Sequence, residues 1–136
     1  MKLLVDTNVI LDWLQKREPY FTAACNVITK CLLESQITGY VSAHSLCDVF
    51  YILRKDFPTE NRFQLIHFLA AHFKVIAETQ EDFLHIASSP EITDLEDGLQ
   101  MLCAQKMQLD YIVTRNLDDF NLSVVPAILP EHLPLT

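Results

Sequence analysis

The fold of this chain is indicated most clearly by residues 2–14, Lys2-Leu3-Leu4-Val5-Asp6-Thr7-Asn8-Val9-Ile10-Leu11-Asp12-Trp13-Leu14. The first part of this stretch, residues 2–5, is a short apolar run that stops at an acid, which is typical of a buried strand. Thr7 or Asn8 is a suitable N-cap for a helix. Apolar residues then recur at helical spacing: Val9, Ile10, Trp13 and Leu14. The stretch therefore predicts a strand that passes directly into a helix.

The rest of the chain repeats this alternation. Helices are expected over residues 19–35, after Ser42, and over 61–72, 79–89 and 95–108, and strands over 37–41, 74–77, 111–113 and 124–125. No internal repeat, low-complexity tract or linker divides the chain, so residues 1–136 are expected to form a single domain. Strands that alternate with helices predict an α/β fold whose mostly parallel sheet is covered on both faces.

Composition narrows the class of protein. The chain has 136 residues, of which half are hydrophobic and 21% charged, so it can build a core and is not disordered. Its two glycines, Gly39 and Gly98, are too few for a Gly-rich phosphate loop. No apolar run approaches the roughly 18 residues of a membrane span, and an acid follows Val5 too early for a signal peptide. We therefore expect a cytoplasmic protein with no membrane contact.

The cysteines and histidines show no metal-binding spacing. Four cysteines occur without a C-x-x-C pair, so we expect buried apolar thiols in a reducing compartment. The five histidines are scattered, and no H-E-x-x-H occurs, so a histidine metal site is not expected.

The net charge is −8, with 18 acidic residues against 10 Lys and Arg. This balance argues against an extended basic surface for nucleic acid. It leaves either a solvated acidic surface or acids that converge on a metal ion. The basic spots open to an RNA backbone are few: Lys16, Arg17, Arg54, Lys55 and Arg115.

Several acids follow the predicted strands. Asp6 comes directly after the first strand, Asp48 lies in the helix after the second, and Asp97 lies in the first turn of helix 95–108. Asp118 and Asp119 follow strand 111–113. Ligand sites of parallel sheets form beyond the carboxyl ends of the strands. Carboxylates that meet there need a proton or a cation, and Mg²⁺ or Mn²⁺ prefers such oxygens.

Each acid also has a purely structural reading. Asp6 and Asp48 are suited to capping a helix, and Asp97 to complementing a helix dipole. Asp94 is best read as a cap or an outer acid on the same helix face as Asp97. Asp118-Asp119 is also compatible with a turn, and the sequence leaves open which of the two faces the site.

Three segments together carry a family resemblance: Leu4–Asp12 (LVDTNVILD), Asp94–Gln100 (DLEDGLQ) and Asp110–Phe120 (DYIVTRNLDDF). They resemble the opening L-D-T-N-V motif, the D-x-E-D-[AG]-x-Q segment and the T-[RN]-[ND]-x-x-D-F ending of PIN-domain proteins, in the same order over nearly the whole chain. The chain length also suits the VapC-like toxin ribonucleases of toxin–antitoxin pairs.

The resemblance implies a three-layer α/β/α sandwich, a Mg²⁺ or Mn²⁺ site and hydrolysis of RNA. It also implies an antitoxin as a separate chain, and homodimers are common in the family. Asp6 and Asp97 match the two most dependable metal-site acids, and Asp119 matches the Asp of the last motif. Asp48 stands where the family usually has Glu, and Asn116 where Asp is frequent. These two departures leave the number of metal ions open.

The expected chemistry is metal-assisted hydrolysis. Asp6 and Asp97 would hold the ion, and Asp48 or Asp119 would orient or deprotonate the attacking water. Thr7, Asn8, Thr114 and Asn116 are candidates for positioning the acids or the substrate phosphate. Arg115 either meets a phosphate in a bidentate way or is a surface arginine.

Two other functions stay open at this stage. Asp48 and Asn116, which depart from the family pattern, are compatible with a non-catalytic PIN-like module that binds RNA or protein and does not cleave RNA. A phosphatase with an Asp nucleophile after the first strand would need a second Asp two residues on, where this chain has Asn8.

Overall fold

The computed structural model describes residues 1–134. Five strands alternate with six α-helices, and three short 3₁₀ turns complete the chain. The elements are β1 (Lys2–Val5), α1 (Thr7–Leu14), α2 (Phe21–Leu33), β2 (Thr38–Ser42), α3 (Ala43–Ile52), η1 (Leu53–Lys55), α4 (Thr59–His72), β3 (Lys74–Ile76), α5 (Gln80–Ala87), α6 (Leu95–Lys106), β4 (Tyr111–Val113), η2 (Leu117–Phe120), β5 (Ala127–Ile128) and η3 (Pro130–His132).

The strands form one sheet in the order β3-β2-β1-β4-β5, and each of its four pairings is parallel. β1 lies at the centre, where Leu4 is opposite Tyr40 of β2 and Ile112 of β4. The expected α/β fold with a parallel sheet is confirmed. Because all strands run the same way, the ends of β1, β2 and β4 meet at one edge of the sheet.

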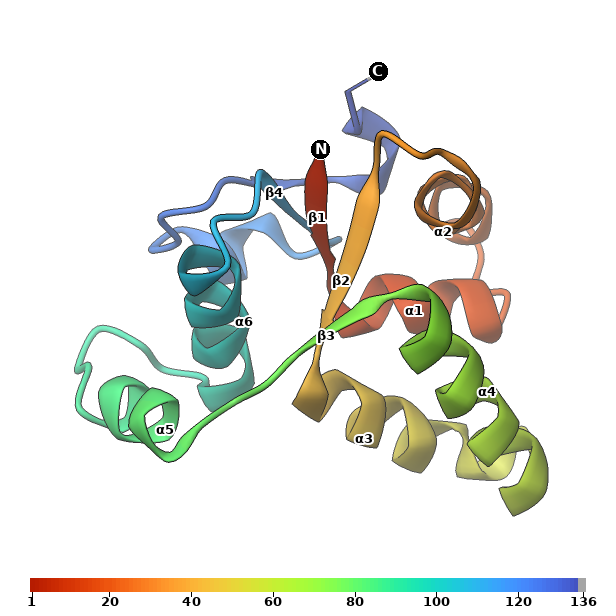
Figure 1. The fold of residues 1–136 in the computed structure, drawn as a ribbon, viewed down its shortest axis with the longest axis horizontal. Helices are drawn as coiled ribbons and strands as arrows, with labels where there is room; N and C mark the ends of the chain where they lie inside the picture. The colour runs from red at the N-terminus through yellow and green to blue at the C-terminus, as the bar shows by residue number, and fades with distance from the viewer. Residues whose placement is uncertain (135–136) are drawn as a thin grey trace.

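The helices cover both faces of the sheet, which gives the three layers of an α/β/α sandwich. In Figure 1, α1–α4 lie on one side of the strands, and α5 and α6 lie on the other. Side chains of β1 alternate between these layers, as the pleat of a strand requires. Leu3 and Val5 belong to the core under α1–α4, while Leu4 belongs to the core with Met101 and Ala104 of α6.

Two details of the predicted chain path are wrong. The last strand is Ala127–Ile128 rather than Val124–Val125, because pairing with β4 selects the segment: Ile112 N donates to Pro126 O and Thr114 N to Ile128 O. Asp6, not Thr7 or Asn8, is the N-cap of α1, since its carboxylate accepts a hydrogen bond from Thr7 N.

The cysteines are free, as expected, but they are not all buried. Burial raises the pKa of Cys31 and of Cys103 to about 12, with a smaller contribution from nearby acids. Cys25 is half-buried and Cys47 is exposed on α3, where the outward face of the helix decides its environment. Within residues 1–134, no helix has the length and apolar character that a membrane crossing requires.

Candidate metal centre

The strand ends gather most of the predicted site residues around one cavity of about 220 Å³, here called the inner cleft. Asp6 reaches it from the end of β1, Asp48 from α3 and Asp97 from the first turn of α6. Asp6 and Asp97 are thus brought together although most of the chain separates them. The remaining residues around the inner cleft are Thr7, Asn8, Leu11, Arg17, His44, Ile52, Glu96, Gln100 and Asn116.

Four donors hold the carboxylate of Asp6, which is 7% exposed. Oδ1 accepts from Thr7 N at 2.8 Å and Gln100 Nε2 at 3.0 Å. Oδ2 accepts from Thr114 Oγ1 at 2.8 Å and Asn8 Nδ2 at 3.2 Å. These bonds fix the rotamer of Asp6, so Asp6 both caps α1 and presents an oriented carboxylate at the cleft.

A chain of hydroxyl groups lies behind these contacts. The Oγ of Ser45 lies 2.7 Å from Thr7 Oγ1 and 2.8 Å from Ser42 Oγ, and it accepts from Gln100 Nε2 at 3.2 Å. Ser45 and Gln100 are buried, and sequence reasoning did not include them in the site. Gln100 closes the D-x-E-D-[AG]-x-Q segment, and this position was the available signal.

Asp97 is half-buried and lies close to other acids. Burial, followed by the charges of Asp94, Asp119 and Asp6, raises its pKa from 3.8 to about 6. Asp94 is the N-cap of α6, as expected, because its Oδ1 accepts from Asp97 N at 2.9 Å. The ionised Asp97 is therefore destabilised until a proton or a cation arrives.

Asp97 also borders a second cavity of about 420 Å³, the outer cleft, which Asp94, Asp118 and Asp119 line as well. Both aspartates of η2 are exposed. Asp119 is the one whose charge contributes to the raised pKa of Asp97. This favours Asp119 over Asp118 as the member that faces the metal-site acids.

Asp48 contacts two residues that sequence reasoning missed. A hydrogen bond with Asp48, then burial and the charge of Asp48, raise the pKa of Glu96 to about 7. One ligand atom each from His44, Asp48 and Glu96 lie within 4.8 Å of one another. A histidine metal site was not expected from the sequence, whereas His44 belongs to a group that could hold a metal ion. The signal was present, because His44 and Asp48 are four residues apart on one helix face.

Thr114, Arg115 and Asn116 follow β4 but occupy different places. Thr114 is fully buried beneath Asp6, and its Oγ1 also accepts from Asn116 N at 3.1 Å. Asn116 reaches the inner cleft. Arg115 turns to the buried Asp12, to which Nε donates at 2.6 Å and Nη2 at 3.1 Å. The bidentate partner of Arg115 is thus a carboxylate of its own fold, with which any phosphate would compete.

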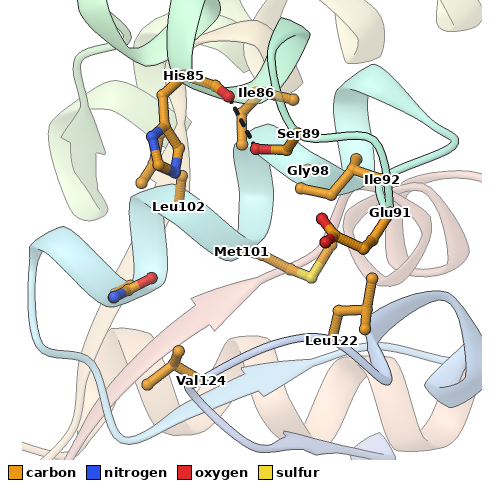
Figure 2. A pocket seen from close by; sticks show the side chains of 11 residues that line it. His85, Ile86, Ser89, Glu91, Ile92, Gly98, Met101, Leu102, Leu122 and Val124 are labelled. Carbon is orange, nitrogen blue, oxygen red and sulfur yellow. Dashed lines mark hydrogen bonds between the residues drawn. The ribbon is translucent and has the colours of Figure 1, made fainter.

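A third hollow lies beside the outer cleft, between α5, α6 and residues 122–124 (Figure 2). Its walls are mixed, with the apolar side chains of Met101, Leu122 and Val124 and the polar side chains of His85 and Glu91 around it. The two cavities are adjacent, since four residues line both of them: Glu91, Ile92, Met101 and Leu122. This hollow borders the outer cleft, and none of the predicted site residues lines it.

The residues present fit a divalent cation. Asp6, Asp48 and Asp97 line one cleft, and Mg²⁺ and Mn²⁺ prefer carboxylate oxygens as ligands. Burial and then the charges of Asp94, Asp119 and Asp6 raise the pKa of Asp97, and a bound cation would offset both effects. A purely capping role does not explain why the acids of three elements face the same cavity.

Comparison with known proteins places the chain in a family. The PIN domain model matches residues 2–118, so the chain belongs to the PIN domain family. No curated protein sequence matches the chain significantly.

Three solved structures show the shared fold. The toxin-antitoxin complex from Klebsiella pneumoniae is 21% identical, with 94% of this chain and 97% of that chain covered and a TM-score of 0.67. VapBC2 from Rickettsia felis, bound to a DNA fragment from its promoter, is 15% identical, with 95% and 98% covered and a TM-score of 0.68. FitAcB from Neisseria gonorrhoeae is 21% identical, with 96% and 99% covered and a TM-score of 0.67.

Proposed function

We propose that this protein is a metal-dependent endoribonuclease that hydrolyses RNA phosphodiester bonds. The observation that carries the proposal is that Asp6 and Asp97, which lie far apart in the sequence, line one cleft together with Asp48. Membership of the PIN domain family supports the same activity. Asp6, Asp97, Asp48 and Asp119 would be the catalytic and metal-binding acids.

A bound Mg²⁺ or Mn²⁺ ion would lower the pKa of a water molecule and polarise a phosphoryl oxygen. Asp6 and Asp97 would hold the ion. Thr114, Gln100 and Asn8 act on Asp6 by fixing both of its oxygens before substrate arrives. Such preorganisation avoids reorienting the carboxylate during the reaction.

The attacking water needs a group that orients it and accepts its proton. Asp48 borders the inner cleft and Asp119 the outer cleft, so the two flank Asp97 from different sides. Thr7, Asn8 and Asn116 would position the substrate at the inner cleft, where Arg17 is the nearby basic group. The products would be a 5′-phosphate and a 3′-hydroxyl.

We also propose an antitoxin protein as the partner. Structures similar to this chain are of toxin–antitoxin complexes, one of them bound to promoter DNA. An antitoxin would cover the acidic clefts, where an inserted arginine would pair with the carboxylates. Homodimerisation is a further proposal, for which α3 and α4 offer the exposed side chains of Tyr51 and Phe63.

The test is cleavage of a panel of cellular RNAs with Mg²⁺ or Mn²⁺, with and without chelator. Since loss of an outer-shell partner alone costs about 10–100-fold, Asp6→Asn and Asp97→Asn should each lower cleavage by more than about 100-fold. Glu60→Gln, on the exposed first turn of α4, is the matched control. Unchanged cleavage by either Asp variant contradicts the assignment. Wild-type protein that binds RNA but does not cleave it would be a non-catalytic PIN-like module.

A further inference from the structure

His44, Asp48 and Glu96 form a group of possible metal ligands within the inner cleft, and Asp48 is shared with the acids of the proposed nuclease site. A ring nitrogen of His44 and one carboxylate oxygen from each acid lie within 4.8 Å of one another. The cleft therefore offers one imidazole nitrogen beside two carboxylate oxygens.

Glu78 holds the imidazole of His44 in place from behind. Its Oε1 accepts from His44 N at 2.7 Å, and its Oε2 lies 2.6 Å from His44 Nδ1. The Glu78 side chain is 4% exposed. A carboxylate at Nδ1 fixes the tautomer and ring orientation, which leaves Nε2 to bind a metal. This carboxylate–histidine arrangement is the usual support of a histidine metal ligand.

We propose that His44, Asp48 and Glu96 form a second cation site that binds a first-row transition-metal ion in preference to Mg²⁺, with Glu78 as the positioning residue. The preference follows from the donor set, because imidazole suits the transition metals whereas Mg²⁺ favours carboxylate oxygens and water. The role of this ion in RNA cleavage rests on the proposed function. Its binding does not.

The distances between the three potential ligand atoms of His44, Asp48 and Glu96 are close to those found around a bound metal ion. Ligands on opposite sides of an ion with bonds of about 2.1 Å lie roughly 4.2 Å apart, so small rotations bring the three atoms onto one ion. Gln100, whose Nε2 donates to Asp6 Oδ1 and Ser45 Oγ, supplies an independent indication of a ligand in the inner cleft. It is 1% exposed and lines the same cleft, and its Oε1 has no hydrogen-bond partner among residues 1–134. A buried carbonyl oxygen of this kind is ordinarily satisfied by a bound water or ion.

The probe is Mn²⁺, measured by electron paramagnetic resonance with excess Mg²⁺ present to occupy the all-carboxylate site. Wild-type protein should keep about one Mn²⁺ per chain, with pulsed spectra that show coupling to a histidine nitrogen. His44→Gln should abolish the nitrogen coupling. Glu78→Gln should weaken Mn²⁺ binding by about 10–100-fold while the coupling remains, as loss of an outer-shell partner does. His85→Gln, an exposed histidine of α5, is the matched control. Circular dichroism checks that each variant is folded.

Three results would overturn the site: complete displacement of Mn²⁺ by Mg²⁺, absence of nitrogen coupling in the wild type, or coupling that survives His44→Gln. The first would show that no site prefers Mn²⁺ to Mg²⁺, and the second that His44 is not a ligand of the bound ion. Unchanged Mn²⁺ affinity in Glu78→Gln would overturn the role of Glu78.

The proposed cation site and the proposed nuclease activity can be refuted independently of each other. Asp6→Asn should abolish cleavage and keep the nitrogen-coupled Mn²⁺. Wild-type protein that binds this ion without cleaving RNA would refute the proposed function alone. Cleavage of RNA without nitrogen coupling would refute the second site alone.

Discussion

Replacing Arg115 with Ala removes the main partner of a buried charge. The Asp12 side chain is 1% exposed, and Arg115 donates to both of its oxygens. The guanidinium also lies 4.1 Å from the centre of the Tyr20 ring. Arg17 is the remaining cation, with its Nη1 3.8 Å from Asp12 Oδ1. Without Arg115, the carboxylate keeps one distant partner.

Breaking a buried ion pair from one side costs about 3–5 kcal/mol, because the other charge stays buried. Arg115 is 23% exposed and Arg17 still contributes, so the expected loss in free energy of unfolding lies at the low end, about 3 kcal/mol. Arg17→Ala is the matched control. Its side chain is 38% exposed and its contact is long, so its loss should cost about 0–1 kcal/mol.

Urea unfolding followed by circular dichroism measures both changes, since the midpoint multiplied by the slope gives the free energy. The double variant Asp12→Asn with Arg115→Ala tests the mechanism, because a neutral amide needs no cation. It should be more stable than Arg115→Ala alone. Equal losses for Arg115→Ala and Arg17→Ala, or no recovery in the double variant, would refute the reasoning that Arg115 serves the buried carboxylate.

Two further predictions concern stability. Because the pKa of Asp97 is raised from 3.8 to about 6, the folded state binds its proton more tightly than the unfolded chain, and ionisation destabilises the fold as pH rises through this range. Without divalent metal, Asp97→Asn should therefore raise the free energy of unfolding by roughly 1 kcal/mol at about pH 8, a value reduced for solvent screening. Below about pH 4 the substitution should leave the free energy of unfolding unchanged. A stabilisation that does not depend on pH in urea titrations would contradict this prediction. At Gly39, an added Cβ would lie 2.6 Å from the Phe73 ring, so Gly39→Ala should cost about 1–3 kcal/mol and Phe73→Leu should recover part of it. A Gly39→Ala variant as stable as the wild type by urea unfolding would show that the ring moves freely.

The sequence is sufficient for the order of elements where the apolar pattern is strong. Residues 2–14 predict β1 and α1 because an apolar run and a helical stripe are separated by one acid. The apolar pattern predicts a strand at residues 124–125, because their side chains resemble those of Ala127 and Ile128, which form β5. The carbonyl of Pro126, which accepts from Ile112 N, shows that pairing with β4 selects the strand.

The candidate site divides in the same way. From the sequence, Asp6 is expected after a strand and Asp97 in the first turn of the helix that precedes strand 111–113. Since that helix runs back along the sheet before the parallel strand begins, its first turn and the end of β1 are expected at the same edge. Tertiary structure alone decided the directions of side chains. The pairing of Arg115 with Asp12 and of Glu78 with His44 depends on how separate helices and strands pack. No local pattern in the sequence encodes which of these distant side chains come into contact.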